Sequence, residues 1–234
     1  MSSTMRILLS VLVFACMLVP AGCGGDDGGA YVCETCSDTP EALPADDHRP
    51  TGIYKGVVTG GDNTGTVRVD ISSDETTGKL QLVVDGKPRT ATSFSIDQQG
   101  DSTVYTFTGD GFTVVLVVAA DGTVGSVTVT VDGTTLDATL AKETSESLVQ
   151  AFEGTWSGQD FSGTWNFVAA GGALSGTFDG SDSGAFVGTA SEGRIELTLP
   201  EGGPLGVGSQ SGDSVQGTFE KSGVSGTWMG LRRL

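Results

Sequence analysis

Residues 127–140 read V-T-V-T-V-D-G-T-T-L-D-A-T-L, and this stretch decides the fold. On both sides of Asp132-Gly133 apolar residues alternate with polar ones, which is the period of a β-strand with one buried face. Asp-Gly between two such runs is among the strongest short-range signals for a β-hairpin. The stretch therefore predicts two antiparallel strands joined by a tight turn.

The same pattern continues outward to residues 51–141. Alternating runs begin near Val67, Leu80 and Phe94, and turn signals such as Asp85-Gly86 and Asp121-Gly122 separate them. About eight evenly spaced strands with no helical pattern between them predict an all-β domain. We expect an antiparallel meander that closes into a small barrel or a sandwich.

One predicted strand, residues 112–120, is apolar on both faces. Strands of this kind are normally covered on both sides. Two interpretations remain open: a central strand with unusual packing, or a strand whose outer face meets a second domain. Residues 143–152 then interrupt the alternation. They are compatible with one or two helical turns that place Leu148 and Phe152 on one face, and we interpret them as a domain junction.

Residues 153–234 repeat the β pattern with more glycine, in units such as Gly154-Thr155-Trp156 and Gly226-Thr227-Trp228. This segment predicts a second β-meander domain in tandem with the first; a single sheet wrapped from both halves is the alternative. Because side chains alternate along a strand, its large apolar residues share one face. Either they only fill a core, or some of them line a ligand site. The candidate ligand-binding residues are Trp156, Ser162, Trp165 and Trp228.

Residues 154–178 resemble the first two strands of avidin-type proteins, through Gly154-Thr155-Trp156 and residues 172–178, G-A-L-S-G-T-F. The resemblance implies a small β-barrel. Of the family's biotin contacts, the serine position is kept as Ser162, but the asparagine position is Gly158 and the tyrosine position is Phe178. Because two donors to the ligand's polar group are missing, the resemblance implies the barrel shape and not the biotin ligand.

The amino-terminal residues predict export. An apolar run of 13 residues, 7–19, is too short to span a bilayer and has the length of a signal-peptide core. Ala21-Gly22-Cys23 resembles the lipobox of bacterial lipoproteins, although Pro20 replaces the usual leucine. The resemblance implies a signal peptide over 1–22, lipid attachment at Cys23 and firm anchoring by two or three acyl chains.

Two further observations bear on this interpretation. Removal of the leader and lipidation of Cys23 leave two cysteines, an even number that suits an oxidising compartment. Cleavage after Ala21 would instead release an unlipidated, secreted protein with three cysteines. Gly24 follows Cys23, and in enteric bacteria this resemblance implies transport to the outer membrane. We therefore expect a protein of the cell envelope, at the outer membrane or cell surface and not in the cytoplasm.

Residues 23–50 are rich in Gly, Asp and Pro, and their acidic side chains are opposed only by Arg49. This composition predicts a flexible, self-repelling linker. Within it, Cys33 and Cys36 form a C-x-x-C pair. The pair lacks the βαβ context of a redox motif, the adjacent histidine of a haem attachment site and the further ligands of a zinc site, so a local disulfide is predicted.

The net charge of −17 opposes nucleic-acid binding, because phosphate recognition needs basic patches. The single histidine, His48, lies in the linker and offers no catalytic pairing, so we expect neither an enzyme nor a bound cofactor or metal. The sequence predicts a lipid-anchored envelope protein that is a non-catalytic module binding a small molecule or a protein. A structural lipoprotein without a ligand is the alternative.

Overall fold

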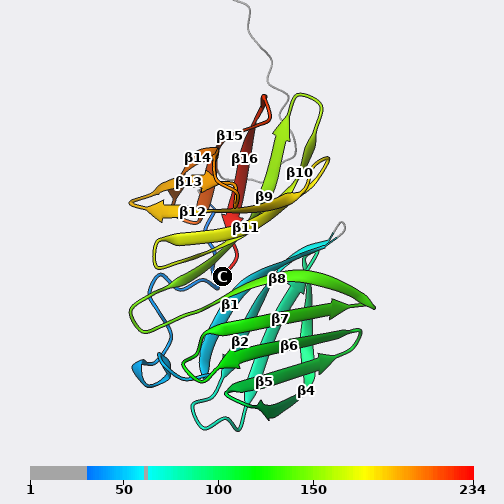
Figure 1. The fold of residues 1–234 in the computed structure, drawn as a ribbon, viewed down its shortest axis with the longest axis vertical. Helices are drawn as coiled ribbons and strands as arrows, with labels where there is room; N and C mark the ends of the chain where they lie inside the picture. Colours follow the sequence, from blue (N-terminus) through cyan, green and yellow to red (C-terminus); the bar gives the residue numbers. More distant parts are fainter. Residues whose placement is uncertain (1–30, 61–62) are drawn as a thin grey trace, which may run out of the picture.

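The computed structural model describes residues 31–60 and 63–234. It is all-β, apart from one short 3₁₀ turn, η1 (Pro44–Asp46), and contains two closed antiparallel barrels of eight strands each. The barrels follow one another along the long axis of the molecule (Figure 1). The predicted all-β tandem architecture is therefore confirmed. Within the described ranges no helix has the length and apolar character needed to cross a bilayer.

The first barrel, barrel 1, is a simple up-and-down meander in which each strand pairs with the next and β1 pairs with β8. Its strands are β1 (Gly52–Gly60), β2 (Asn63–Ile71), β3 (Gly78–Val84), β4 (Lys87–Gln99), β5 (Ser102–Gly109), β6 (Phe112–Ala119), β7 (Val124–Val131) and β8 (Thr134–Lys142). Its buried residues are mostly Val and Leu, with Tyr54, Tyr105, Phe107 and Phe112, and they form one contiguous core.

The second barrel, barrel 2, repeats this order and closes through β9 and β16. Its strands are β9 (Val149–Gly158), β10 (Ser162–Ala170), β11 (Ala173–Gly180), β12 (Gly184–Ser191), β13 (Arg194–Thr198), β14 (Pro204–Ser211), β15 (Ser214–Lys221) and β16 (Val224–Arg232). Its inward-facing residues include all three tryptophans of the chain.

The hairpin between β7 and β8 forms where the sequence predicts it. Asp132 and Gly133 have φ values of 49° and 82°. Positive φ at both central residues is typical of the type I′ turn, whose twist matches that of the flanking strands. Asp85 and Gly86 form the turn between β3 and β4 in the same way, with φ values of 52° and 71°.

The one or two helical turns with which residues 143–152 are compatible do not form. After β8 the chain makes a tight turn closed by Thr144 and Ser147, and β9 already begins at Val149. Val149 and Ala151 are buried against Val57 of barrel 1. The apolar residues of this stretch therefore alternate as in a strand, and they pack on the neighbouring barrel rather than on one face of a helix.

The suggestion that residues 112–120 meet the second domain is also wrong. The contact between the barrels is made by β1, β2 and β8 on one side and by β9, β10 and β11 on the other. Strand β6 pairs with β5 and β7 in barrel 1, and its outward side chains, including Val115 and Val117, are half-buried. At the actual contact, the Asn166 side-chain amide donates to the carbonyl of Val58 over 2.9 Å.

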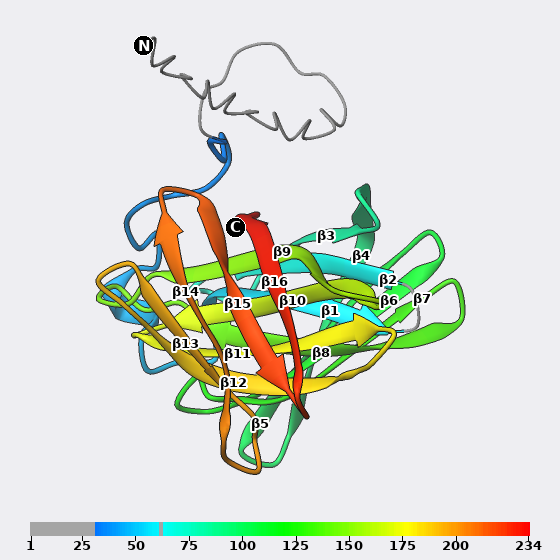
Figure 2. The same ribbon diagram turned by 90° about the horizontal axis from the view of Figure 1, so that it is seen from above.

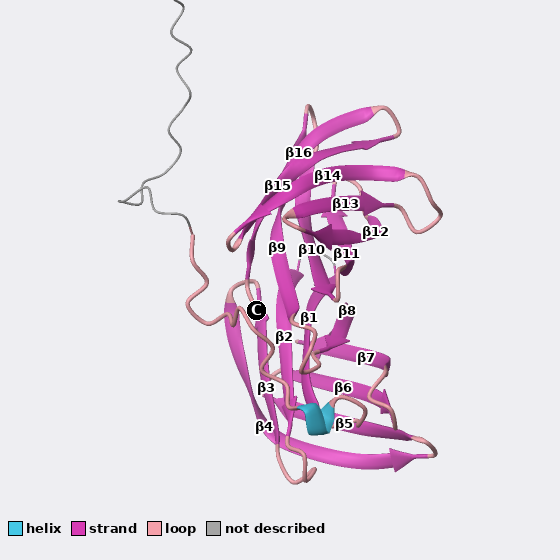
Figure 3. Cartoon of the chain, turned by 90° about the vertical axis from the view of Figure 1, so that its left-hand side faces the viewer, coloured by secondary structure: helices cyan, strands magenta, loops and turns pink. Residues whose placement is uncertain are grey.

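The linker predicted over 23–50 is not a free spacer where the structure describes it. Residues 31–50, here called the strap, pack along both barrels and end near η1 (Figure 3). Their acidic groups meet buried basic partners far away in the sequence: Asp38 pairs with Arg232, and Glu41 pairs with Lys55. The composition of residues 31–50 does not predict these ion pairs, because the basic partners lie in the barrels. Residues 23–30 and Cys23 lie outside the described residues.

Candidate functional site

The interior of barrel 2 holds a cavity of about 260 Å³ that is open at one end. Its wall is dominated by aromatic rings, with aliphatic side chains such as Leu197 and Leu205 between them. The aromatic residues are Trp156, Phe161, Trp165, Phe167, Phe178, Phe186, Phe219 and Trp228. The cavity is therefore an apolar chamber of a kind that typically holds a small ligand.

Glycines in the barrel wall give these rings their space. A Cβ atom at Gly154 would lie 2.5 Å from Trp165 Cζ2, and one at Gly217 would lie 2.5 Å from Trp228 Cε2. Real side chains do not approach so closely, so each ring lies flat over backbone that only glycine can provide. The Gly-x-aromatic units of the sequence are thus the local cause of the wide, aromatic interior.

Hydrogen bonds fix the three indole rings in place. Trp156 Nε1 donates to the carbonyls of Thr164 and Asp179 over 3.1 and 3.2 Å. Trp165 Nε1 donates to the carbonyl of Thr155 over 3.0 Å, and Trp228 Nε1 donates to that of Thr218 over 3.2 Å. Every indole N–H is therefore satisfied by the barrel backbone, and the rings offer the cavity only their carbon surfaces.

The rings also pack edge to face. The Trp165 and Trp228 centroids are 5.5 Å apart with an interplanar angle of 85°. Trp156 meets Phe219 at 5.7 Å and 90°, and Phe178 at 6.3 Å and 89°. These are the arrangements that aromatic quadrupoles favour, so the cavity wall is built before any ligand enters.

Polar groups gather only at one end of the cavity, here called the mouth. Lys221 Nζ lies 2.6 Å from Asp182 Oδ2 and 4.6 Å from the centroid of the Phe178 ring. The hydrogen bond from Lys221 holds the pKa of Asp182 below its ordinary value. The mouth thus pairs a carboxylate with an ammonium group that rests on an aromatic face.

The predicted ligand-binding residues are only partly brought together. Trp156, Trp165 and Trp228 all line the cavity, but Ser162 is exposed at the start of β10 and does not. Its backbone N–H and carbonyl bond to the Ser181 hydroxyl. Sequence reasoning missed Asp182 and Lys221, because they lie in different hairpins and only barrel closure brings them together.

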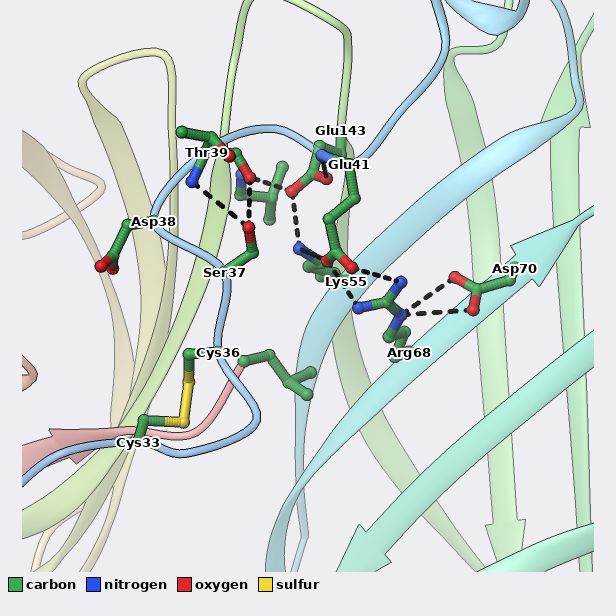
Figure 4. A network of polar contacts seen from close by, with 12 residues as sticks. Cys33, Cys36, Ser37, Asp38, Thr39, Glu41, Lys55, Arg68, Asp70 and Glu143 are labelled. Carbon is green, nitrogen blue, oxygen red and sulfur yellow. Dashed lines mark hydrogen bonds and ion pairs between the residues drawn. A yellow bond between two sulfur atoms is a disulfide. The ribbon is translucent and has the colours of Figure 1, made fainter.

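A second group of buried polar residues lies where the strap crosses the junction of the barrels (Figure 4). Lys55 Nζ is 2.7 Å from Glu143 Oε2 and 3.0 Å from Glu41 Oε2. The Glu143 side chain also accepts from the backbone N–H groups of Glu41 and Val149. Every carboxylate oxygen here has a partner, so this cluster joins strap and barrels and offers no free group for catalysis.

The ends of the strap are fixed in a similar way. The predicted disulfide between Cys33 and Cys36 is present, and the N–H of Cys33 donates to Asp213 over 2.7 Å. Arg232 is buried and bonds Asp38, Asp213 and the carbonyl of Ser37. Over the described part of the chain, no cluster of His, Cys, Asp and Glu side chains is arranged to hold a metal ion.

These observations define one candidate ligand site, the aromatic cavity of barrel 2, and one structural cluster at the barrel junction. No protein-family model, curated protein or solved structure matches the chain.

Proposed function

We propose that the protein is a lipid-anchored, non-catalytic component of the cell envelope whose barrel 2 binds a small apolar molecule. The observation that supports this most strongly is the preformed aromatic cavity of about 260 Å³. A core that served only stability would fill such a space, because empty apolar volume in a folded protein costs free energy. In barrel 1 of the same chain, Val, Leu and aromatic side chains form one contiguous buried cluster.

The cavity limits the size of the ligand. An engineered cavity of about 150 Å³ holds benzene, so by proportion this one takes about ten carbon atoms. Because the indole N–H groups are all bonded to backbone carbonyls, the buried part of the ligand has no donor to meet and is itself apolar. A single alkyl chain or a fused pair of rings meets both conditions.

Binding is tested with 1-octanol on the full protein. All three tryptophans line the cavity, so their emission reports directly on its occupancy. We expect a saturable change in emission and a rise in the melting temperature, because a ligand that binds only the folded state stabilises it. Val224→Phe narrows the mouth and weakens binding. Val207→Phe is the matched control, because Val207 is 52% exposed outside the cavity.

The result also decides between the two interpretations of the aromatic residues. If apolar probes of this size change neither emission nor melting temperature, the aromatics serve only as core. The protein is then a structural lipoprotein without a small ligand. If Val224→Phe and Val207→Phe weaken binding equally, the probe binds outside the cavity.

The lipid anchor is supported by the apolar run of residues 7–19 and by Ala21-Gly22-Cys23. It is tested by mass spectrometry of the mature amino terminus. We expect a chain that begins at an acylated Cys23 and that partitions with membranes, and Cys23→Ser is expected to abolish that partitioning. An unmodified amino terminus at Gly22 would instead identify a secreted protein.

A further inference from the structure

The mouth of the cavity differs in charge from its walls. In an up-and-down barrel, alternate hairpin connections lie at the same end. The connections β9–β10, β11–β12, β13–β14 and β15–β16 therefore surround the mouth. They carry Asp160, Asp182 and Glu201, and the basic residue beside them is Lys221 at the end of β15. The mouth is therefore acidic, within a chain whose net charge is −17.

The contacts of Lys221 indicate which kind of group fits the mouth. Its ammonium group bonds Asp182 and lies 4.6 Å from the centroid of the Phe178 ring. Both neighbours line the cavity, together with Trp156 and Phe219. A carboxylate beside several aromatic faces is the chemistry that recognises organic ammonium ions. The protein's own lysine occupies that position in this structure.

We propose that the cavity takes an amphipathic organic cation, whose apolar tail lies among the rings and whose ammonium head replaces that of Lys221 beside Asp182 and Phe178. This inference rests on the proposed binding function and names the class of ligand. The acidic mouth attracts such a cation and repels an anion with the same tail. Displaced from the ring, the Lys221 side chain extends into solvent, where its charge is fully hydrated.

The experiment compares three probes with the same eight-carbon tail: octyltrimethylammonium, 1-octanol and octanoate, each below the concentration at which it forms micelles. Binding is followed by tryptophan emission and by calorimetry on the full protein. We expect the cation to bind about fivefold more tightly than 1-octanol, and octanoate to bind most weakly. Cation affinity equal to or below that of 1-octanol or octanoate overturns the inference.

Two variants locate the effect at the mouth. Lys221→Gln removes the competing ammonium group and is expected to strengthen binding of the cation about threefold, with little change for 1-octanol. Arg194→Gln is the control, because it removes the same charge from an exposed side chain at the far end of barrel 2. Equal effects of the two substitutions would show that only net charge matters and would overturn the inference. Asp182→Asn is expected to weaken binding of the cation.

The two proposals fail in different ways. If none of the three probes binds, the proposed binding function fails, and this inference fails with it. If 1-octanol binds but the cation has no advantage over it, the cavity is a ligand site and only the assignment of its ligand class is wrong.

Discussion

Replacement of Lys55 by Met tests whether the buried cluster at the barrel junction stabilises the protein. The side chains of Lys55 and Glu143 are 1% and 0% exposed, and their charged groups are 2.7 Å apart. Met keeps most of the aliphatic length of Lys but removes the ammonium group. The carboxylate of Glu143 then remains buried with only two backbone N–H donors, from Glu41 and Val149.

The magnitude follows from the environment of that carboxylate. Breaking a buried ion pair by removing one partner costs about 3–5 kcal/mol, because an uncompensated charge stays in the interior. Because two N–H donors still bond the carboxylate, we expect Lys55→Met to lower the free energy of unfolding by about 3 kcal/mol, the lower end of this range. Arg194→Met is the matched control. Arg194 forms an ion pair with Glu196, and the two side chains are 71% and 53% exposed. Such surface pairs contribute about 0–1 kcal/mol to stability.

The assay is unfolding in urea, followed both by tryptophan emission, which reports on barrel 2, and by far-ultraviolet circular dichroism, which reports on both barrels. With an m-value of about 3 kcal/mol/M, a loss of 3 kcal/mol lowers the midpoint by about 1 M. The control should shift it by about 0.3 M or less. Adding Glu143→Gln to Lys55→Met should restore about 2 kcal/mol, since the buried charge is then gone.

The reasoning is refuted if Lys55→Met unfolds within about 0.3 M of the wild type, as the surface control does. It is also refuted if Glu143→Gln gives no recovery in the Lys55→Met background, because the loss would then come from packing rather than from the unpaired carboxylate. A midpoint that falls by the same amount in both signals would further show that the barrels unfold together.

Two further predictions concern the barrel wall and the strap. Gly217→Ala should destabilise the protein by about 1–3 kcal/mol and shift tryptophan emission, because the added Cβ displaces the Trp228 ring. Burial raises the pKa of Glu41, but hydrogen bonds from two basic side chains outweigh this effect, so the pKa is lowered. Hydrogen bonds from Ser145 lower the pKa of Asp47. The ionised carboxylates of Glu41 and Asp47 therefore stabilise the folded state above about pH 5, and this stabilisation is lost as the pH falls through their lowered pKa values. The difference in urea midpoint between the wild type and an E41Q/D47N variant should shrink from pH 7 to pH 3.

Local patterns in the sequence were sufficient to predict the strands. Asp85-Gly86 and Asp132-Gly133 form tight turns because the two residues themselves determine the turn geometry. The glycine and aromatic units likewise predicted that Trp156, Trp165 and Trp228 share one face of a β-domain. Each of these features depends on residues that are close together in the chain.

Features that depend on distant partners were not predictable in this way. The strap looked like a free linker because its partners, among them Arg232 and Lys55, lie in the barrels. Asp182 and Lys221 are 39 residues apart and meet only because β11, β12, β15 and β16 belong to one closed barrel. The helical turn expected over 143–152 failed because burial against barrel 1 outweighed the local pattern.

The docked strap also bears on the proposed membrane anchor. If Cys23 carries the proposed lipid, a free linker up to Thr51 would span at most about 100 Å when fully extended. Because the chain is already attached to barrel 2 at Tyr31 and Cys33, only seven residues lie between Cys23 and Tyr31. The eight steps from Cys23 to Tyr31 span at most about 30 Å.

If Cys23 carries the proposed lipid, this short connection also orients the folded body relative to the bilayer. The strap attaches beside Asp213, in the connection between β14 and β15. This connection and the β15–β16 hairpin lie at opposite ends of barrel 2 (Figure 2). Residues of the β15–β16 hairpin line the cavity mouth, so the mouth is at the end away from the strap. The end that holds the strap would then face the bilayer, and the mouth would face outward. A ligand would enter from the aqueous side of the envelope rather than by lateral transfer out of the lipid.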